Sequence, residues 1–347
     1  MLTVKNQFVQ SLKGLCIIFV VMIHLPWGTA DNWSAWIWIG VRQIINFAVA
    51  TFFFLSAYYS KKFNDDDEFS VSHYYGKRMT RLLVPYLIWT SVYVFVIPVL
   101  TTGQIDSQWL FHMLTGKGPT YFLLALAQFT LLLPLLQRYK SHRWLNVLFW
   151  LITPAYLTFY YSYNLTTGEE FRPEQFFCFP WFACYYMGLK MQNQEFRKRI
   201  CDMSVVTVLF VAMIILAVSI VEAAFIYHYT NIMSFAISQI TFGSVAYSLV
   251  VIILFTILWH GDSQNNKNWL SSIGDYSMGI FLMHPLFNWF FKYIAIHIPG
   301  GIFWYSTPYG MISVHIAILV LSVSASYFAS RKISKTFPQL VYIFGLK

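Results

Sequence analysis

Long apolar segments recur along the whole chain, and they constrain its fold more than any other feature. A transmembrane helix needs about 20 mostly apolar residues to cross a hydrocarbon layer of about 30 Å. Segments of this length follow one another with short polar connections, and 11% of the residues are charged, against about 25% in an ordinary soluble domain. The sequence therefore predicts an all-α, polytopic bundle of transmembrane helices, with residues 1–347 forming a single integral-membrane domain.

The apolar segments predict ten spans and place both termini on one side of the membrane. The spans are expected near residues 10–27, 36–59, 83–101, 119–137, 144–162, 175–191, 203–227, 232–259, 274–297 and 309–330. With cytoplasmic termini, 19 of the 23 lysines and arginines fall in cytoplasmic segments, whereas Lys117 and Arg172 alone fall in outer loops. This asymmetry follows the positive-inside rule and favours cytoplasmic termini. The net charge of +9 then needs no nucleic-acid partner.

The cysteines give no sign of a metal site or of a redox pair. Cys16, Cys178, Cys184 and Cys201 show neither metal-ligand spacing nor a CxxC motif, and three of them fall inside apolar spans. A free cysteine in such surroundings behaves as a small hydrophobe, so we expect buried thiols and no metal.

His24 is the ionisable side chain that stands out in the first span. Such groups are costly to bury in a bilayer and therefore mark functional sites. His24 follows Lys13 by eleven residues, which places it about 16 Å deeper in the membrane on one helix. Histidine is well suited to take a proton from a hydroxyl near neutral pH, so His24 is the candidate general base. The alternatives are a structural histidine bonded to a neighbouring helix and, for Lys13, a snorkelling topology anchor.

Two short motifs mark the first two spans. The first, QSLKGLCIIFVVMIH, places Lys13-Gly14 before His24, with ten residues between the lysine and the histidine. The second, FFFLSAYY, occupies residues 52–59 and contains Ala57 after its serine.

Two further motifs follow in the third and ninth spans. GKRMTRLLVPY contains Arg78, Arg81 and a proline, and IGDYSMGIFLMHPLF at residues 273–287 keeps Gly274 and the pair His284-Pro285. In their order and spacing the four motifs resemble those of the acyltransferase family 3 membrane proteins. The family's arginine is lysine here and its FFxxSG glycine is alanine. A lysine keeps the charge but lacks the planar fork of a guanidinium.

The resemblance implies acyl-CoA, in most cases acetyl-CoA, as the donor and a carbohydrate as the acceptor. Arg78 and Arg81 are three residues apart, so they share one face as a helix begins, and such a pair suits phosphates. Without the resemblance, the two arginines would be interpreted as a cluster of cytoplasmic charges that follows the positive-inside rule. With the resemblance, Lys13, Lys77, Arg78 and Arg81 are the expected cofactor-binding residues, and Asp275 is a possible support on the same side.

Ionisable residues also gather towards the outer ends of several spans. Arg42, Glu222 and Lys292 lie within about two turns of an outer boundary, at a depth comparable with His24. Burying them together is costly unless they pair or line a hydrated pocket, which a sugar acceptor requires. Arg42 and Glu222 are therefore candidate substrate-binding residues. The alternative is that Lys292 snorkels and that Glu222 pairs with Arg42. His284 is a possible support in mid-membrane, or the mark of a kinked helix.

The expected function is therefore a membrane O-acyltransferase of the bacterial inner (plasma) membrane, in contact with membrane lipid. It would modify a carbohydrate or lipid-linked glycan such as O-antigen or capsule. A transporter or flippase for a polysaccharide or a lipid-linked sugar is the first rival and predicts no dependence on acyl-CoA. A non-catalytic component of an envelope complex is the second rival, and it predicts that substitution of His24 leaves function intact.

Overall fold

The computed structural model describes residues 6–25, 33–63, 68–168, 176–259, 267–301, 304, 307–339, 341 and 343–344. Regular secondary structure within these ranges is helical throughout, as the sequence predicts. Arg172, expected in an outer loop, lies outside the described residues.

The helices follow one another in the order in which the apolar segments occur. They are α1 (Gln7–Ile23), α2 (Trp33–Ile45), α3 (Phe47–Tyr58), α4 (Glu68–Ser91), η1 (Val92–Val96), α5 (Ile97–Thr102), α6 (Trp109–Thr115), η2 (Gly118–Thr120), α7 (Tyr121–Tyr139), α8 (Arg143–Thr167), η4 (Phe179–Trp181), α9 (Phe182–Lys190), α10 (Gln194–Cys201), α11 (Val205–Thr230), α12 (Met233–Ala236), α13 (Phe242–Leu258), α14 (Trp269–Asp275), α15 (Ser277–His297) and α17 (Pro308–Thr336). Side-chain oxygens cap the first turns of six of these described helices, which fixes where they begin. The capping residues are Asn6, Asn193, Ser204, Thr241, Asn268 and Thr307.

Five helical stretches are long and apolar enough to cross a membrane. They are Ala35–Tyr58, His73–Thr102, Trp109–Tyr139, Val205–Thr230 and Tyr309–Thr336, and the shorter apolar helices α1 and α13 accompany them. Each of the ten predicted spans overlaps one of these stretches or one of α8, α9 and α15. The number of crossings and the side of the termini stay predictions.

Three predicted boundaries are wrong. The spans predicted at 36–59 and 83–101 leave residues 60–82 as a connection, but α4 begins at Glu68, because hydropathy marks the apolar segment and not the end of a helix. The eighth span is interrupted between α12 and α13. The sixth span contains the three-residue η4, which includes Pro180, followed by the nine-residue α9.

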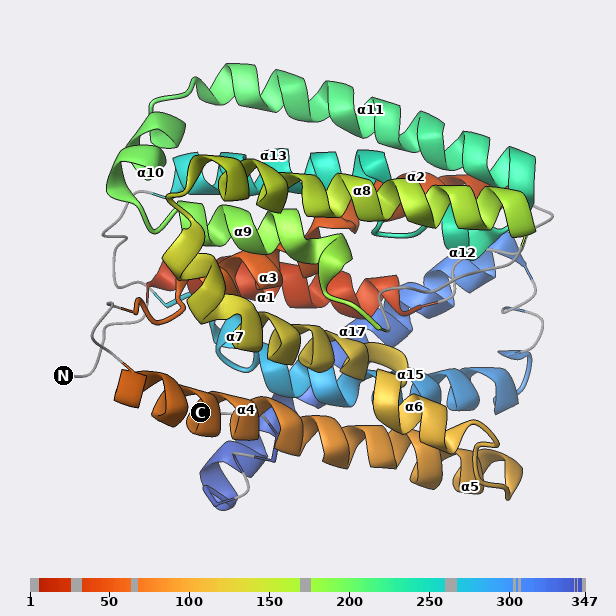
Figure 1. Cartoon of the computed structure of the whole chain (residues 1–347). Helices are drawn as coiled ribbons and strands as arrows, with labels where there is room; N and C mark the ends of the chain where they lie inside the picture. Colours follow the sequence, from red (N-terminus) through yellow and green to blue (C-terminus); the bar gives the residue numbers. More distant parts are fainter. Residues whose placement is uncertain are drawn as a thin grey trace.

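The long helices lie side by side with their axes roughly along one direction (Figure 1). Helix α11 forms one edge of the bundle and α4 the opposite edge, while α10 lies at one end and α5, α6 and α12 lie near the other. Apolar side chains such as Val206, Phe210 and Met213 are exposed along α11. Exposed apolar surface of this kind suits contact with lipid.

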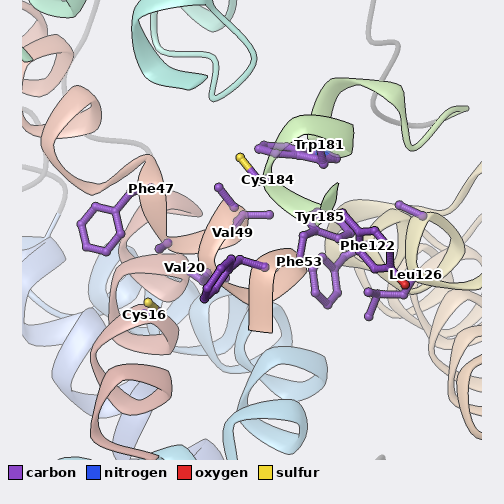
Figure 2. Close-up of a cluster of buried hydrophobic side chains, with 14 of the residues drawn as sticks. Cys16, Val20, Phe47, Val49, Phe53, Phe122, Leu126, Trp181, Cys184 and Tyr185 are labelled. Carbon is purple, nitrogen blue, oxygen red and sulfur yellow. The ribbon is translucent and has the colours of Figure 1, made fainter. Parts of the chain in front are cut away.

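Aromatic packing joins α3, α7 and α9 in the core. The rings of Phe129 and Tyr185 stack with centroids 4.0 Å apart, and Phe53 stacks on Trp181 at 5.5 Å. Phe53, Trp181 and Tyr185 lie in the same buried cluster as Cys16 of α1 (Figure 2). Cys16, like Cys178 and Cys184, is a buried free thiol, as the sequence predicts.

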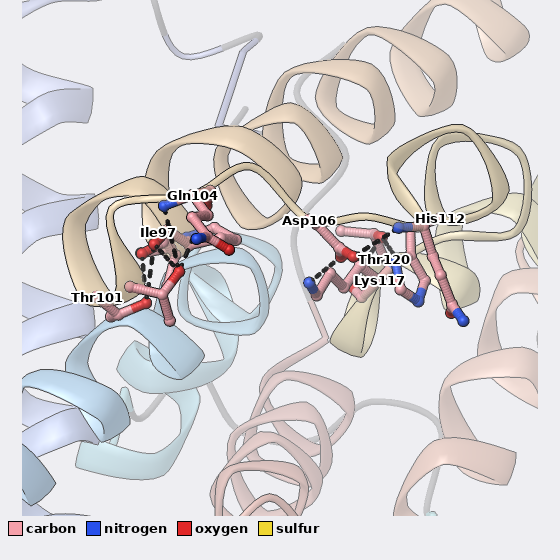
Figure 3. Close-up of polar contacts among 10 residues, drawn as sticks. Ile97, Thr101, Gln104, Asp106, His112, Lys117 and Thr120 are labelled. Atoms are coloured by element: carbon pink, nitrogen blue, oxygen red, sulfur yellow. Dashed lines mark hydrogen bonds and ion pairs between the residues drawn. The ribbon is translucent and has the colours of Figure 1, made fainter.

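A polar cluster ties together the connection from α5 to α7. Asp106 accepts a hydrogen bond from Lys117 Nζ and lies 2.8 Å from Nδ1 of His112 (Figure 3). The carboxylate therefore fastens α6 and the start of η2 to the loop that precedes them.

Candidate active site

The first and fourth motifs meet where α1 crosses α14. A Cβ added to Gly14 would lie 2.0 Å from the carbonyl oxygen of Leu270, and one added to Gly274 would lie 1.8 Å from the carbonyl oxygen of Gln10. Since the two backbones touch, only glycine fits at either position. Lys13 and Asp275 are the chain neighbours of these glycines, so the crossing brings both residues near the middle of α1.

The two segments meet again ten residues after Gly14 and ten residues after Gly274. The imidazole rings of His24 and His284 lie with their centroids 5.0 Å apart and their planes at 39°. Because Gly14 meets Gly274 and His24 meets His284, α1 and the α14–α15 segment run in the same direction and in register. The sequence offered the two histidines as separate candidates, and the structure brings them together.

The two imidazoles differ in their surroundings. His24 follows the last residue of α1 and is accessible, although it lies deep within the bundle. His284 is fully buried, and its Nδ1 lies 3.2 Å from the carbonyl oxygen of Ile280. This contact requires a proton on Nδ1, which leaves a lone pair on Nε2. Within the described residues that Nε2 has no hydrogen-bond partner.

Arg42 holds the end of the helix that carries His24. Its Nη1 donates to the carbonyl oxygen of Ile23 at 2.8 Å, and its Nη2 donates to that of Ile237 at 2.9 Å. Its side chain is buried, with the guanidinium carbon 5.8 Å from the ring centroid of Trp38. A planar fork suits two acceptors at once. Arg42 therefore fixes the position of the helix end that carries His24.

Two more polar side chains, Gln43 of α2 and Asn46 between α2 and α3, hold the segment that Arg42 contacts. Gln43 donates to the carbonyl of Ala236 at 3.1 Å, and Asn46 donates to that of Ser238 at 3.2 Å. Together with Arg42, they satisfy three successive carbonyls where α12 ends, and such carbonyls have no partner within the helix. Gln43 and Asn46 were missed by the sequence reading, although two polar residues next to Arg42 in an apolar span were a usable signal.

Glu222 belongs to a different contact set. It accepts hydrogen bonds from the hydroxyl of Tyr161 and, at 2.7 Å, from the backbone N–H of Gly243. Within the described residues no ion pair joins it to Arg42, so the pairing considered from the sequence is wrong. Glu222 links α8, α11 and α13.

The second and third motifs are also in contact. Arg78 Nη2 donates to Ser56 Oγ at 3.2 Å, and its buried Nε has no partner within the described residues. Lys77 and Arg81 are exposed on the same helix, α4. The sequence predicted that Arg78 and Arg81 lie where a helix begins, but they lie within α4, which begins at Glu68.

Comparison with known proteins decides the family. The model of a family described as an acyltransferase domain matches residues 6–331, which is nearly the whole chain. The chain belongs to the acyltransferase family 3 membrane proteins. No curated protein and no solved structure matches it.

The acyltransferase is therefore a multi-pass membrane protein whose four motifs form two contacting pairs. One pair joins α1 to α14 and α15 and holds the two histidines, and the other joins α3 to α4 through Ser56 and Arg78. Asp275 lies 3.4 Å from Lys267 Nζ, next to the crossing of α1 and α14. The pair of imidazoles and the Arg78 guanidinium are thus carried by separate helix pairs.

Proposed function

We propose that this acyltransferase moves an acyl group, most simply acetyl, from cytoplasmic acyl-CoA to a hydroxyl of an envelope carbohydrate such as O-antigen or capsule. The observation that carries the proposal is the accessible imidazole of His24, held by Arg42 and set against the buried His284. An accessible imidazole deep in the bundle is a suitable base for a hydroxyl that must react away from water.

His24 takes the proton of the acceptor hydroxyl as the hydroxyl oxygen attacks the carbonyl carbon of the thioester. The tetrahedral intermediate collapses, the carbon–sulfur bond breaks, and the imidazolium returns its proton to the departing thiolate. The products are an ester and free coenzyme A. Because the ring centroids of His24 and His284 are 5.0 Å apart, two imidazolium ions would repel each other, so the pair carries at most one positive charge at a time.

The donor is proposed to bind at α4. Lys77, Arg78 and Arg81 supply cations, and the unpartnered Nε of Arg78 is a free donor for a phosphate oxygen. Lys13, beside the crossing of α1 and α14, is proposed to contact the same coenzyme. Arg42 and Glu222 act through backbone groups of the bundle, so we propose positioning roles for both in place of direct contact with the sugar.

Mass spectrometry of envelope glycans from bacteria with and without the gene tests the proposal, with the protein localised to the inner membrane. Labelled acetyl groups supplied as acetyl-CoA to purified protein and acceptor glycan should appear as esters on the glycan. Transport of the glycan without any dependence on acyl-CoA would instead support the flippase alternative.

A further inference from the structure

Polar side chains recur every four residues along one face of α15. They are His284, Asn288 and Lys292. Residues four apart on a helix share a face and are about 6 Å apart along its axis. His284 is 0% exposed, Asn288 is 8% exposed and Lys292 is half-buried. The polar face thus leads from the histidine pair towards the far end of the helix, which is the predicted outer side.

Asn288 is the unusual member of this face. Within the described residues, neither its Nδ2 nor its Oδ1 has a hydrogen-bond partner, and the same is true of Nε2 of His284 one turn earlier. Buried polar groups in proteins are almost always paired, because an unpaired group loses its hydrogen bonds to water without replacement. Three unpaired polar atoms on one face therefore indicate a ligand that supplies the missing partners.

Gln43, Gln137 and Asn46 are buried amides that use at least one end. Gln43 accepts from Ser219 and Ser244 through its Oε1 and donates through its Nε2, and Gln137 accepts from the N–H of Phe63 at 2.8 Å and donates to a carbonyl. Asn46 donates through its Nδ2, although its Oδ1 has no partner among the described residues. Asn288 differs because neither end has a partner within the described part of the chain, one turn after His284.

We infer that Asn288 binds the acceptor, with its Nδ2 donating to one hydroxyl oxygen and its Oδ1 accepting from a neighbouring hydroxyl. An amide presents a donor and an acceptor side by side, which suits two adjacent hydroxyls of a sugar ring. The Nε2 of His284 accepts from the same ligand nearer His24. This deepens the proposed function and rests on it for the reaction of the bound hydroxyl.

The variant that tests this is Asn288→Leu, which keeps the size and removes both hydrogen-bonding atoms. Since it also removes two unpaired buried polar atoms, its thermal unfolding midpoint in detergent should be unchanged or higher. Acylated glycan should fall about ten-fold or more, because hydrogen bonds to the acceptor are lost. Binding of labelled acetyl-CoA should match that of the wild type. Asn288→Ala is the second variant if leucine fails to pack.

The matched control is Asn164→Leu in α8. Asn164 is also fully buried, but its Nδ2 donates to the carbonyl of Tyr160 in its own helix at 2.7 Å. The control should retain full acylation. Full acylation by Asn288→Leu and Asn288→Ala would overturn the inference and leave the proposed function standing.

A second readout needs no turnover. Purified wild-type and Asn288→Leu proteins are unfolded by heat with increasing glucose or N-acetylglucosamine. Sugars stabilise proteins in general because they are excluded from the surface. The rise in the unfolding midpoint of Asn288→Leu measures this general effect. A larger rise in the midpoint of the wild type supports the inference, even if the wild type shows no acylation and the proposed function fails. Equal rises in the two proteins overturn it.

Discussion

Arg42 Nη1 donates a hydrogen bond of 2.8 Å to the carbonyl oxygen of Ile23, which is the last residue of α1 and the chain neighbour of His24. The second branch of the same guanidinium reaches Ile237 at 2.9 Å. One side chain therefore joins the helix end that carries His24 to the segment between α12 and α13. The direction of the His24 imidazole therefore depends on Arg42 through the backbone of Ile23.

Arg42→Lys tests this positioning role. A lysine keeps the charge but presents a single ammonium in place of a fork, so it cannot hold both carbonyls in the same way. We expect kcat for acyl transfer to fall about ten-fold, because small displacements of a catalytic group are costly. The KM for acyl-CoA should not change. The exposed Arg138 provides the control, since Arg138→Lys should leave both constants at wild-type values. An unchanged kcat in Arg42→Lys would contradict the role.

His24→Ala should abolish acylation while the protein still inserts and accumulates. The alanine removes the proposed base and leaves only a small space at an accessible helix end. Mass spectrometry of the glycan measures the outcome, and immunoblotting of membranes checks the amount of protein. His228, which is exposed near the end of α11, is the control for loss of an imidazole elsewhere. Normal acylation in His24→Ala would remove this residue from the mechanism.

Arg78→Ala and Arg81→Ala should weaken binding of labelled acyl-CoA about ten- to hundred-fold, because a hydrogen bond to a charged group contributes roughly 1.5–3 kcal/mol. Arg42→Ala and Glu222→Ala should leave this binding nearly unchanged. The exposed Arg199 of α10 controls for a general loss of positive charge. If all four variants lose coenzyme binding equally, Arg78 and Arg81 have no special part in holding the coenzyme, and the proposed donor site at α4 is wrong.

Gly14→Ala should destabilise the protein by about 1–3 kcal/mol, since its methyl group must displace the backbone at Leu270. Gly40, in α2, is the matched control: a Cβ there meets nothing within 4 Å. Gly40→Ala should be neutral or stabilising by up to about 1 kcal/mol, because alanine favours helix more than glycine does. Thermal unfolding in detergent measures both. Similar midpoints for the two variants would show that the crossing of α1 and α14 tolerates a side chain.

The Asp106 cluster outside the spans predicts a dependence on pH. The hydrogen bond from Lys117 lowers the pKa of the Asp106 carboxyl from 3.8 to about 2. Because the pKa of Asp106 is lower in the folded than in the unfolded protein, the ionised carboxylate stabilises the folded state at pH values above 3.8. This stabilisation is lost as the pH falls towards 2. The difference in unfolding midpoint between wild type and Lys117→Met should therefore shrink across this window. A difference that stays constant with pH would exclude the ion pair as its cause.

The sequence predicted the helical class and the approximate positions of the spans, because a run of apolar residues of the right length has few other uses. It could not show that α4 begins at Glu68, since hydropathy reports where the apolar segment ends and the helix extends beyond that point. Nor could it show the break between α12 and α13, because the carbonyls there are satisfied by side chains nearly 200 residues earlier, such as Asn46, whose amide reaches Ser238.

Within the site, the sequence identified His24 and His284 but not their contact. Their pairing depends on the glycine crossing, and a spacing of ten residues in both segments becomes meaningful only when Gly14 and Gly274 are known to touch. It grouped Arg42 with Glu222 by depth alone, whereas their partners are on different helices. Asn288 carried no signal in the sequence, because a single asparagine in an apolar helix becomes unusual only when its missing partners are seen.

The glycine crossing also limits how α1 and α14 can move against each other. The carbonyl of Leu270 lies against Gly14 and the carbonyl of Gln10 lies against Gly274, while the hydroxyl of Ser11 donates to Oδ1 of Asn268 beside them. Rotation of either helix about its own axis would force a side chain into the contact between the two backbones. The register that places His24 against His284 is therefore maintained by packing ten residues away from either ring.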